Sequence, residues 1–513
     1  MQDEQIERES MDFDVVIVGG GPSGLSAAIR LRQLALQAGL DEFMVCVVEK
    51  GSEFGAHTLS GAVIEPRALD ELIPDWKEKG APLNVPVSED RIYYLNSAKR
   101  STKVPDGLVP APMHNHGNYI VSLGNVVRWL AEQAEELEVM MFPGFPASEI
   151  LYNDDGSVRG VLTGDMGVAS DGSKKSGYEP GYELNAKYTI FAEGCRGHLG
   201  KRLISRFALD KDSDPQHYGI GIKELWEVDP SKHEQGVVMH GLGWPLTETG
   251  STGGWWLYHD ENNQVSFGLV IDLAYHNPYM SPFDEMQRLK THPVIRQVLE
   301  GGKRLSYGAR ALTKGGLNSL PKLTFPGGVL VGDDAGFLNP AKIKGTHTSM
   351  KSGMLAAEAV FEALQSGRQH DEVESYSKRY KESWLFEDNQ SARNFSPVMH
   401  RMGQFMGGAF TFLEHNLLKG KMPLTVRDTT PDYDSLDKAS TSYKPDYPKP
   451  DGKLTFDKLS SVFISNTNHA EDQPTHLKLT DPTIPVTVNL PIYAEPAQRY
   501  CPAGVYEIVK DAE

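Results

Sequence analysis

The chain has 513 residues, of which 39% are hydrophobic and 23% charged, and its formal net charge is −18. This negative charge argues against nucleic-acid binding, which needs a basic surface, and against membrane attachment through a polybasic patch. The widely spaced Cys46, Cys195 and Cys501 argue against a disulfide-stapled secreted domain. No stretch approaches the roughly 20 apolar residues that span a bilayer, so we expect an intracellular protein with at most peripheral membrane contact.

The first predicted element is a dinucleotide-binding unit at residues 12–24, which read DFDVVIVGGGPSG. VVIV is typical of a buried parallel strand, and the G-x-G-x-x-G that follows opens a predicted helix. Its glycines permit a tight turn, close approach of a pyrophosphate to the backbone, and close packing of helix and strand. A second predicted strand, FMVCVVEK, ends near the usual position of a carboxylate that binds ribose hydroxyls. The candidate cofactor-binding residues here are Gly19, Gly20, Gly21, Pro22, Ser23, Gly24 and Glu49.

Residues 327–354, GGVLVGDDAGFLNPAKIKGTHTSMKSGM, favour FAD over NAD as the cofactor. VLVGD predicts a strand that ends in Gly332 and Asp333, and an aspartate there can bond a ribityl hydroxyl, which only a flavin has. A helix is predicted from about Gly345 and Thr346, and its positive end can face the flavin pyrimidine. We hypothesise that Thr346 and Asn339 tune the flavin potential. The sequence has no second G-x-G-x-x-G unit, so we expect a donor other than nicotinamide.

The stretch between these two segments, residues 206–309, predicts a sheet that carries a substrate site. It is rich in β-branched and aromatic residues, as in GIGIKELWEV, TGGWWLYH and NQVSFGLVI. Its aromatic side chains are candidates either for an apolar tunnel or for ordinary core packing, and the pattern favours the core for each residue singly. They are Trp244, Trp255, Trp256 and Tyr258.

Two further segments, 91–113 and 404–426, are unusually apolar for loops. The first is apolar at both ends, and the second contains Phe405, Phe410, Phe412, Leu413, Leu417 and Leu418. Either segment fits shallow insertion into a bilayer interface or packing between domains, and their spacing alone favours neither.

The predicted fold class is α/β: a Rossmann-like FAD-binding domain of the glutathione-reductase type with an inserted mixed sheet. The first part of that domain is expected at residues 11–205, the inserted domain at 206–309 and the second part at 310–427. The polar, proline-containing stretch 428–452 is a predicted linker, so we expect a last, partial domain at 428–513.

Several strings resemble the electron-transfer flavoprotein:ubiquinone oxidoreductase family, from about residue 12 to the last residue. They include VVIVGGGPSGLSAAIRL, GAHTLSGAVIEPRAL, KIKGTHTSMKSG, YPKPDG and RYCPAGVYE. The resemblance implies an FAD enzyme that takes single electrons from reduced electron-transfer flavoprotein and passes two to ubiquinone through FAD and a [4Fe–4S] cluster. It implies a quinone domain with contacts at Gly253 and Gly254, and membrane docking through segments 91–113 and 404–426.

The resemblance also implies that the last domain is ferredoxin-like and that Cys501, in RYCPAGVYE, is the first cluster ligand. Three more ligand cysteines would follow downstream, so we expect the chain to be truncated, because one thiolate cannot hold a four-iron cluster. The implied location is peripheral, on the cytoplasmic face of a bacterial inner membrane, or on the mitochondrial inner membrane if the source is eukaryotic.

Other interpretations remain open from the sequence. An FAD-dependent hydroxylase or a polyprenyl reductase shares the glycine-rich and GD signals but lacks the CPAGVYE domain. A flavin-binding fragment without turnover is a third possibility. A nitrogen-fixation relative, whose cluster lies on a separate chain, should lack residues 430–513.

Overall fold

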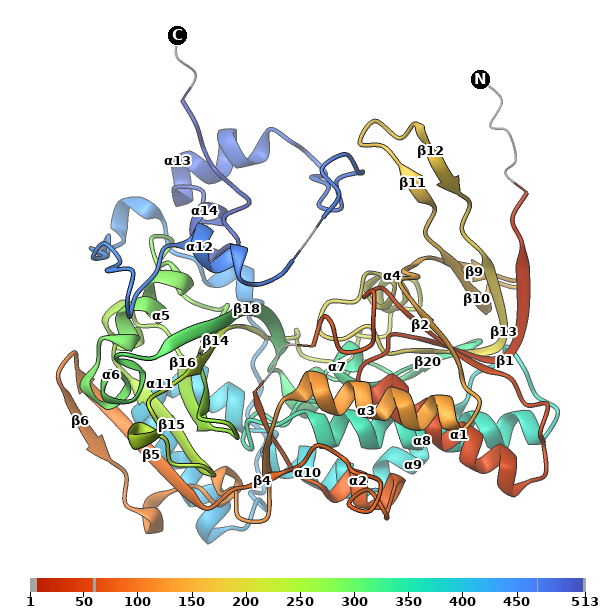
Figure 1. Ribbon diagram of the computed structural model, residues 1–513, viewed down its shortest axis with the longest axis horizontal. Coiled ribbons are helices and arrows are strands. Elements are labelled where there is room, and N and C mark those ends of the chain that lie inside the picture. The colour runs from red at the N-terminus through yellow and green to blue at the C-terminus, as the bar shows by residue number, and fades with distance from the viewer. Residues whose placement is uncertain (1–6, 59–60, 468, 511–513) are drawn as a thin grey trace.

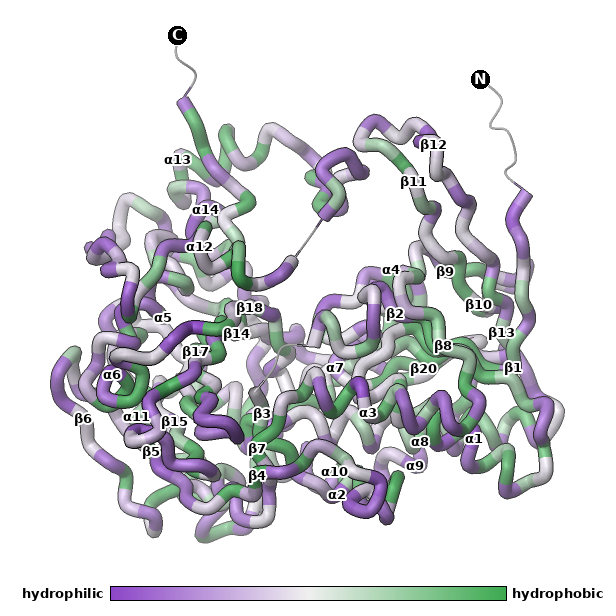
Figure 2. Tube along the Cα trace, in the orientation of Figure 1, coloured by the Kyte–Doolittle hydropathy of each residue, from purple (hydrophilic) through white to green (hydrophobic). Residues whose placement is uncertain are grey.

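The computed structural model describes residues 7–58, 61–467 and 469–510, and two large sheets organise them (Figure 1). The first sheet has the order β19-β20-β13-β1-β2-β8, with β10 and β9 joined to β13. Its strands are β1 (Ser10–Val18), β2 (Val45–Glu49), β8 (Met140–Pro143), β9 (Ala147–Tyr152), β10 (Val158–Thr163), β13 (Glu183–Phe191), β19 (Thr324–Phe325) and β20 (Gly328–Leu330). Hydrophobic residues are concentrated along these central strands (Figure 2), as expected for a parallel sheet covered on both faces.

The sheet contains strands from both predicted parts of the Rossmann-like domain. β1 pairs in parallel with β13 and β2, and β13 pairs in parallel with β20. The strand predicted from VLVGD therefore lies two places from the strand predicted from VVIV, although the inserted sheet separates them in the chain. The α/β fold class is confirmed.

Two long helices cross closely beneath this sheet and bring its two halves together. They are α1 (Pro22–Gln37) and α8 (Thr346–Gln365), and α3 (Leu123–Glu136) packs beside α1. A Cβ built on Gly353 would lie 2.2 Å from the carbonyl oxygen of Ser23, so only glycine permits this crossing. The remaining helices around the sheet are α2 (Arg67–Leu72), α4 (His198–Arg206), α7 (Gly332–Ala335), α9 (Glu374–Lys381) and α10 (Trp384–Ala392).

The second sheet is mixed, with the order β18-β14-β17-β16-β15-β5-β6. Its strands are β5 (Glu89–Ser97), β6 (Arg100–Lys103), β14 (Tyr218–Glu227), β15 (Val237–Gly243), β16 (Gly253–His259), β17 (Gln264–Asp272) and β18 (Lys303–Thr313), and α5 (Pro282–Lys290) and α6 (Pro293–Leu299) pack on it. Segment 91–113 therefore begins as two strands rather than as an apolar loop, since β5 pairs in parallel with β15.

Smaller elements complete the chain. A three-stranded sheet contains β3 (Ala62–Ile64), β4 (Val85–Pro86) and β7 (Tyr119–Val121), and a hairpin contains β11 (Met166–Val168) and β12 (Lys174–Glu179). The last helices are α11 (Phe395–Phe412), α12 (Lys458–Phe463), α13 (Leu490–Tyr493) and α14 (Ala497–Tyr500). No helix in the described part of the chain is both long and apolar enough to cross a membrane.

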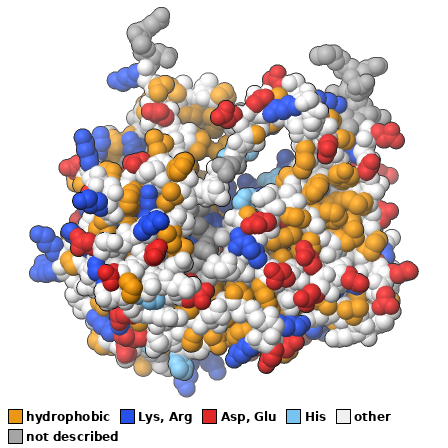
Figure 3. Space-filling view, in the orientation of Figure 1, with side chains coloured by type: hydrophobic (Ala, Val, Ile, Leu, Met, Phe, Trp, Pro, Cys, Tyr) orange, Lys and Arg blue, Asp and Glu red, His pale blue; other side chains and the backbone are white. Residues whose placement is uncertain are grey.

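The C-terminal segment reaches across one face of the molecule to the β11–β12 hairpin. The backbone N–H of Ser170 donates to a carboxylate oxygen of Asp472 at 2.8 Å, and Lys175 forms an ion pair with the same carboxylate at 3.4 Å. Below this contact the face is hollowed, with basic and histidine side chains at the margin (Figure 3). The hollow lies between the C-terminal segment and the Rossmann-like sheet.

A buried ion triad lies at the β18–β14 edge of the second sheet. The Glu224 carboxylate, which is 0% exposed, lies 3.0 Å from the ammonium of Lys290 and 3.1 Å from the guanidinium of Arg304. Burial lowers the pKa of Lys290, and Glu224 opposes that shift. Arg304 also donates to the hydroxyl of Ser461 in α12 at 2.7 Å, so the triad ties the C-terminal segment to this sheet.

We expect Glu224→Gln to lower the free energy of unfolding by about 3–5 kcal/mol, because it leaves two buried cations without a carboxylate. Glu227→Gln is the matched control, since Glu227 ends the same strand with an exposed side chain. Urea denaturation followed by tryptophan fluorescence measures both variants. Equal stability of the two variants would show that the triad contributes nothing.

Candidate functional site

The glycine-rich loop between β1 and α1 has the geometry of a phosphate cradle. Gly19 adopts a φ of +109°, and a Cβ there would lie 2.3 Å from the carbonyl oxygen of Ala192. A Cβ on Gly24 would lie 2.0 Å from the carbonyl oxygen of Gly19. A Cβ on Gly21 would meet no atom within 4 Å, so this glycine faces open space. Two glycines therefore serve the fold, and Gly21 leaves room for a ligand beside the helix end.

Glu49 fixes the loop from the end of β2. One carboxylate oxygen accepts the N–H of Gly20 at 2.9 Å, and the other accepts the N–H of Gly51 at 2.7 Å. Each carboxylate oxygen can accept a further hydrogen bond. Glu49 can therefore shape the loop and bind ribose hydroxyls at the same time. Its position at the end of the second strand agrees with the sequence prediction.

Gly332 and Asp333 lie against this loop. Gly332 has a φ of +59°, and a Cβ there would lie 2.5 Å from the hydroxyl of Ser23 in the first turn of α1. Its N–H donates to the hydroxyl of Ser352 in α8 at 2.8 Å. The two predicted cofactor segments therefore meet through two serine hydroxyls. Ser23 is among the predicted residues, whereas Ser352 is one that sequence reasoning missed.

The Asp333 carboxylate lacks a partner. Its buried Oδ1 has no hydrogen-bond partner among the described residues, and burial raises its pKa to about 6, a shift that Arg310 opposes. Burial and Glu193 likewise raise the pKa of the neighbouring Asp334. A buried acceptor without a partner fits a ligand hydroxyl, as a ribityl chain offers. The residues present therefore fit FAD. Arg310 and Glu193 have no local sequence motif that could have identified them.

The start of α8 is shaped by an unusual loop. Gly345 caps the helix without a side-chain hydrogen bond, so the first N–H groups, including that of Thr346, have no side-chain cap. The β-branched Ile343 has a φ of +57°, a strained conformation of the kind found at functional sites. Asn339 uses its side chain within the loop, accepting the N–H of Lys342 at 3.0 Å and donating to the carbonyl of Asp388 at 3.2 Å. Asn339 therefore shapes this loop.

A set of charged side chains anchors the same loop. The ammonium of Lys342 lies 2.9 Å from Glu65 and 2.6 Å from Asp388, and His347 is buried with a ring nitrogen 3.6 Å from each carboxylate. A cavity of about 380 Å³ adjoins this set and reaches Ala111. Its polar lining includes Arg67, Asp70, His114, His116, Lys342 and Lys344, so it is not an apolar passage.

Gly253 and Gly254 begin β16 in the second sheet, at the point where α11 packs on it. Gln404 of α11 donates to the carbonyl of Gly253 at 3.4 Å and accepts the N–H of Gly243 at 3.0 Å. A Cβ on Gly253 would lie 2.1 Å from the carbonyl oxygen of Val270, so the strand pairing itself requires glycine. The neighbouring aromatic residues Trp244, Trp255 and Tyr258 are buried in the core. They favour the core interpretation over an apolar tunnel.

The two apolar segments meet at one surface. The backbone N–H of Ala111 donates to the side chain of Asn416 at 2.8 Å, and Asn416 donates to the carbonyl of Val109 at 3.0 Å. Around this junction several large apolar side chains are exposed, with Phe405 at 78% and Leu417 at 64%. We call this group the docking surface, and it contains Leu108, Met402, Phe405, Met406, Leu413 and Leu417. Clustered exposed apolar residues of this kind mark an interaction site.

Cys501 lies at the end of α14, buried against the second sheet. Its sulfur accepts the N–H of Val505 at 3.4 Å, and the hydroxyl of Tyr307 in β18 donates to the carbonyl of Pro502 at 2.9 Å. Cys46 and Cys195 lie in and beside the Rossmann-like sheet. Cys501 is thus the one cysteine in the last segment, and these residues do not complete a four-cysteine cluster site.

Comparisons with known proteins address the same regions. Residues 218–312 match the family described as ETF-QO, ubiquinone-binding, and residues 452–513 match electron transfer flavoprotein-ubiquinone oxidoreductase, 4Fe-4S. Residues 17–73 match the NAD(P)-binding Rossmann-like domain. Among solved structures, a geranylgeranyl bacteriochlorophyll reductase-like protein from Thermoplasma acidophilum is similar, with a TM-score of 0.56 at 16% identity, covering 80% of this chain and 99% of that chain. This likeness shows the fold alone.

Relatives match over almost the whole chain. The electron transfer flavoprotein-ubiquinone oxidoreductase of Pseudomonas aeruginosa is 64% identical over 98% of this chain and 92% of its own length. The mitochondrial protein of the same name from Homo sapiens is 52% identical over 98% of this chain and 82% of its own length. The chain belongs to the electron transfer flavoprotein-ubiquinone oxidoreductase family.

Proposed function

We propose that this chain accepts electrons from reduced electron-transfer flavoprotein and passes them to ubiquinone at a membrane surface. One observation carries the proposal beyond family membership. The sheet that matches the ubiquinone-binding family is contacted at Gly253 by α11, and α11 also contributes exposed apolar side chains to the docking surface. A site for a lipid-soluble substrate therefore lies beside a surface suited to a bilayer interface.

The Rossmann-like domain binds FAD in this proposal. The loop Gly19–Gly24 receives the pyrophosphate at the start of α1, Glu49 holds the adenosine ribose, and Asp333 with Gly332 holds the ribityl chain. The uncapped start of α8, at Gly345 and Thr346, faces the flavin pyrimidine and stabilises negative charge there. When bound, FAD can accept electrons singly and release them in pairs, which matches the donor to the quinone.

In this proposal the head group of ubiquinone lies against Gly253 and Gly254 of the second sheet. The docking surface lies on the membrane in this proposal. The family has bacterial and mitochondrial members, and for this chain we propose a bacterial inner membrane, with the protein on its cytoplasmic face. FAD and a [4Fe–4S] cluster are the cofactors, and Cys501 is the proposed cluster ligand that the last segment contributes. The ligand set among the residues present is incomplete, as described above.

The alternative that the sequence left open is a flavin hydroxylase or polyprenyl reductase. The match of residues 452–513 to the 4Fe-4S family model favours the oxidoreductase instead. An assay of NADPH oxidation separates the two candidates, because a hydroxylase or reductase takes its electrons directly from NADPH.

The proposal is tested by anaerobic reduction of the flavin with reduced electron-transfer flavoprotein, followed by mixing with a short-chain ubiquinone. We expect the flavin absorbance to bleach in the first step and to return in the second, with quinol formed in proportion. A flavin that is reduced rapidly by NADPH but not by electron-transfer flavoprotein would contradict the proposal.

Asp333→Asn should have opposite effects on stability and on FAD binding. The raised pKa of Asp333 means that its stability contribution is present below about pH 4 and is lost as pH rises through about 6. The asparagine variant of the apoprotein should therefore gain about 3 kcal/mol at pH 7, and this gain should vanish below about pH 4. Its FAD affinity should fall roughly 10- to 100-fold, because a hydrogen bond to a charged acceptor is lost.

Thermal unfolding across pH and flavin titration measure these two effects. Asp334→Asn is the matched control, since Asp334 faces Glu193 and its pKa is also raised. That variant should gain stability while keeping FAD affinity. Equal FAD affinity in the wild type and in Asp333→Asn would remove Asp333 from the proposed site.

The docking surface is tested by the double variant Phe405→Glu with Leu417→Glu. Each apolar side chain contributes about 1.5–3 kcal/mol on burial, so binding to phosphatidylcholine–phosphatidylglycerol vesicles should weaken roughly 100-fold or more. Reduction of a short-chain quinone in solution should be unchanged. Phe463→Glu is the control, because Phe463 is 87% exposed in α12, outside the docking surface. Vesicle co-sedimentation that is unaffected by the double variant, or equally affected by the control, would contradict this assignment.

A further inference from the structure

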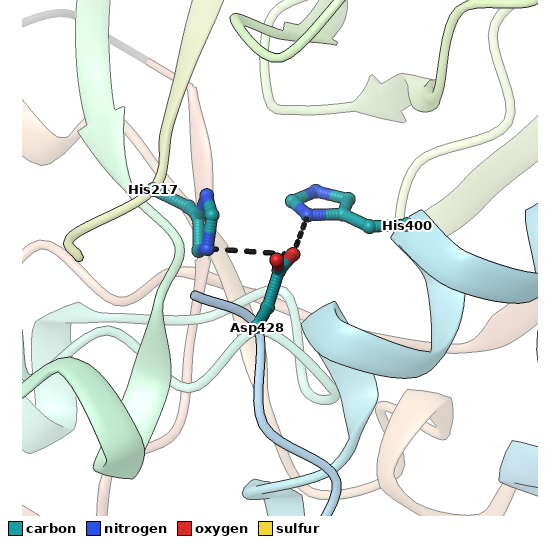
Figure 4. Close-up of side chains that lie close together, drawn as sticks. All are labelled: His217, His400 and Asp428. Atoms are coloured by element: carbon teal, nitrogen blue, oxygen red, sulfur yellow. Dashed lines mark hydrogen bonds and ion pairs between the residues drawn. The ribbon is translucent and has the colours of Figure 1, made fainter. Parts of the chain in front are cut away.

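A row of alternating carboxylates and imidazoles runs beside the second sheet, outside the residues assigned so far. Its central group is Asp428, which lies between the rings of His217 and His400 (Figure 4). The three side chains come from the residue before β14, from α11 and from the segment that follows α11. We call the whole row the carboxylate–imidazole row, and it contains Asp432, His217, Asp428, His400 and Asp272.

Every neighbouring pair in this row is within ion-pair distance. His217 Nδ1 lies 2.7 Å from Asp432, and His217 Nε2 lies 3.4 Å from Asp428. His400 Nδ1 lies 2.9 Å from the same oxygen of Asp428, and His400 Nε2 lies 3.5 Å from Asp272. Each imidazole thus has a carboxylate at both ring nitrogens. A small rotation of either ring converts the longer separations into hydrogen bonds.

Neighbouring charges favour the ionised forms of Asp272, Asp428 and His400. Asp272 and Asp428 raise the pKa of His400 to about 9 against the effect of burial, although Lys314 opposes them. Lys314 also forms an ion pair with Asp272, and the pKa of Asp272 is held well below its usual range despite burial. Asp214 approaches from the other side, where it accepts the backbone N–H of Asp428 at 3.3 Å. His400 is therefore an imidazolium held between two carboxylates at neutral pH.

The inner end of the row touches the proposed quinone site. The hydroxyl of Thr252 donates to Asp272 at 2.6 Å, and Thr252 directly precedes Gly253. His400 lies four residues before Gln404, across the kink at Gly403, and Gln404 contacts the carbonyl of Gly253. The outer end approaches solvent, since the Asp432 side chain is 12% exposed and the adjacent Tyr433 is 81% exposed. The row thus joins the surface to the quinone site.

We propose that the carboxylate–imidazole row carries protons from solvent to the quinone site. This inference rests on the proposed function, because reduction of one quinone takes two electrons and two protons. The flavin supplies the electrons, and each proton enters at Asp432 and leaves through Asp272 and the Thr252 hydroxyl to a quinone oxygen. His400 begins as an imidazolium, so it first releases its Nε2 proton to Asp272, and the neutral ring then turns so that its bare nitrogen takes a proton from Asp428. His217 passes a proton from Asp432 to Asp428 in the same way, and the ring rotations restore the row before the next transfer.

The position of the docking surface explains why such a path is needed. A bilayer in contact with the end of α11 keeps water from the membrane side of the site, and the sheet core closes the other side with buried aromatic residues. His217, His400 and Asp428 have no catalytic task in the electron transfer itself. A role in proton transfer explains why these three side chains are buried between solvent and Thr252.

Asp428→Asn is the primary test, because asparagine keeps the shape but cannot pass a proton between the two imidazoles. In the wild type and the variant, the flavin is reduced anaerobically and then oxidised by short-chain ubiquinone or by ferricenium, which accepts an electron without a proton. We expect oxidation by quinone to slow roughly 100-fold, with a larger solvent deuterium isotope effect, while oxidation by ferricenium is unchanged. His217→Gln, at the outer part of the row, should show the same pattern.

Asp214→Asn is the matched control, since Asp214 is a buried carboxylate that contacts Asp428 but is not part of the row. It should leave both oxidation rates unchanged. An unchanged quinone rate and isotope effect in Asp428→Asn and His217→Gln would overturn the inference, as would equal loss with quinone and ferricenium. A stoichiometric zinc ion that is lost in Asp428→Asn would also overturn it. A wild type that fails to reduce quinone would instead refute the proposed function.

Discussion

The close crossing of α1 and α8 is the contact on which the rest of the molecule depends. Gly353 lets α8 approach the carbonyl of Ser23, and Gly332 fits beneath the hydroxyl of the same serine. Through this crossing, two segments separated by the whole second sheet share one edge of the Rossmann-like sheet. A glycine-rich loop alone binds one half of a dinucleotide. The site becomes suited to a flavin only because Asp333 is placed against that loop.

The second sheet is joined to the Rossmann-like domain at the points where the chain leaves and re-enters that domain. The chain starts the mixed sheet with β5 and β6, completes it after β13, and must then return at β20 beside β13. α11 then follows on from this domain and packs on the mixed sheet through Gln404, next to Gly253. One kinked helix, with a φ of +70° at Gly403, thus connects the proposed quinone site, the docking surface and the carboxylate–imidazole row. The proposed quinone site and the proposed proton path therefore meet at this helix.

Features carried by local sequence could be predicted, and features built by distant contacts could not. The fold class, the glycine loop and the strand ending at Asp333 follow from short motifs whose geometry is local. The strand in segment 91–113 was hidden because its partner, β15, lies far along the chain. The hypothesis that Asn339 tunes the flavin stays a prediction, and the hydrogen bonds by which its amide holds the loop before α8 could not be read from a motif. His217 and Asp432 are 215 residues apart, so no motif could join them.

The central claim is that the loop at Gly21 and the segment at Asp333 form one flavin site. Hydrogen–deuterium exchange of the apoprotein, measured as FAD is added, tests this claim most directly. We predict that amides in residues 19–24 and 332–346 become protected together, with the same dependence on FAD concentration. Protection of one segment without the other, or protection of the two at different FAD concentrations, would contradict the account.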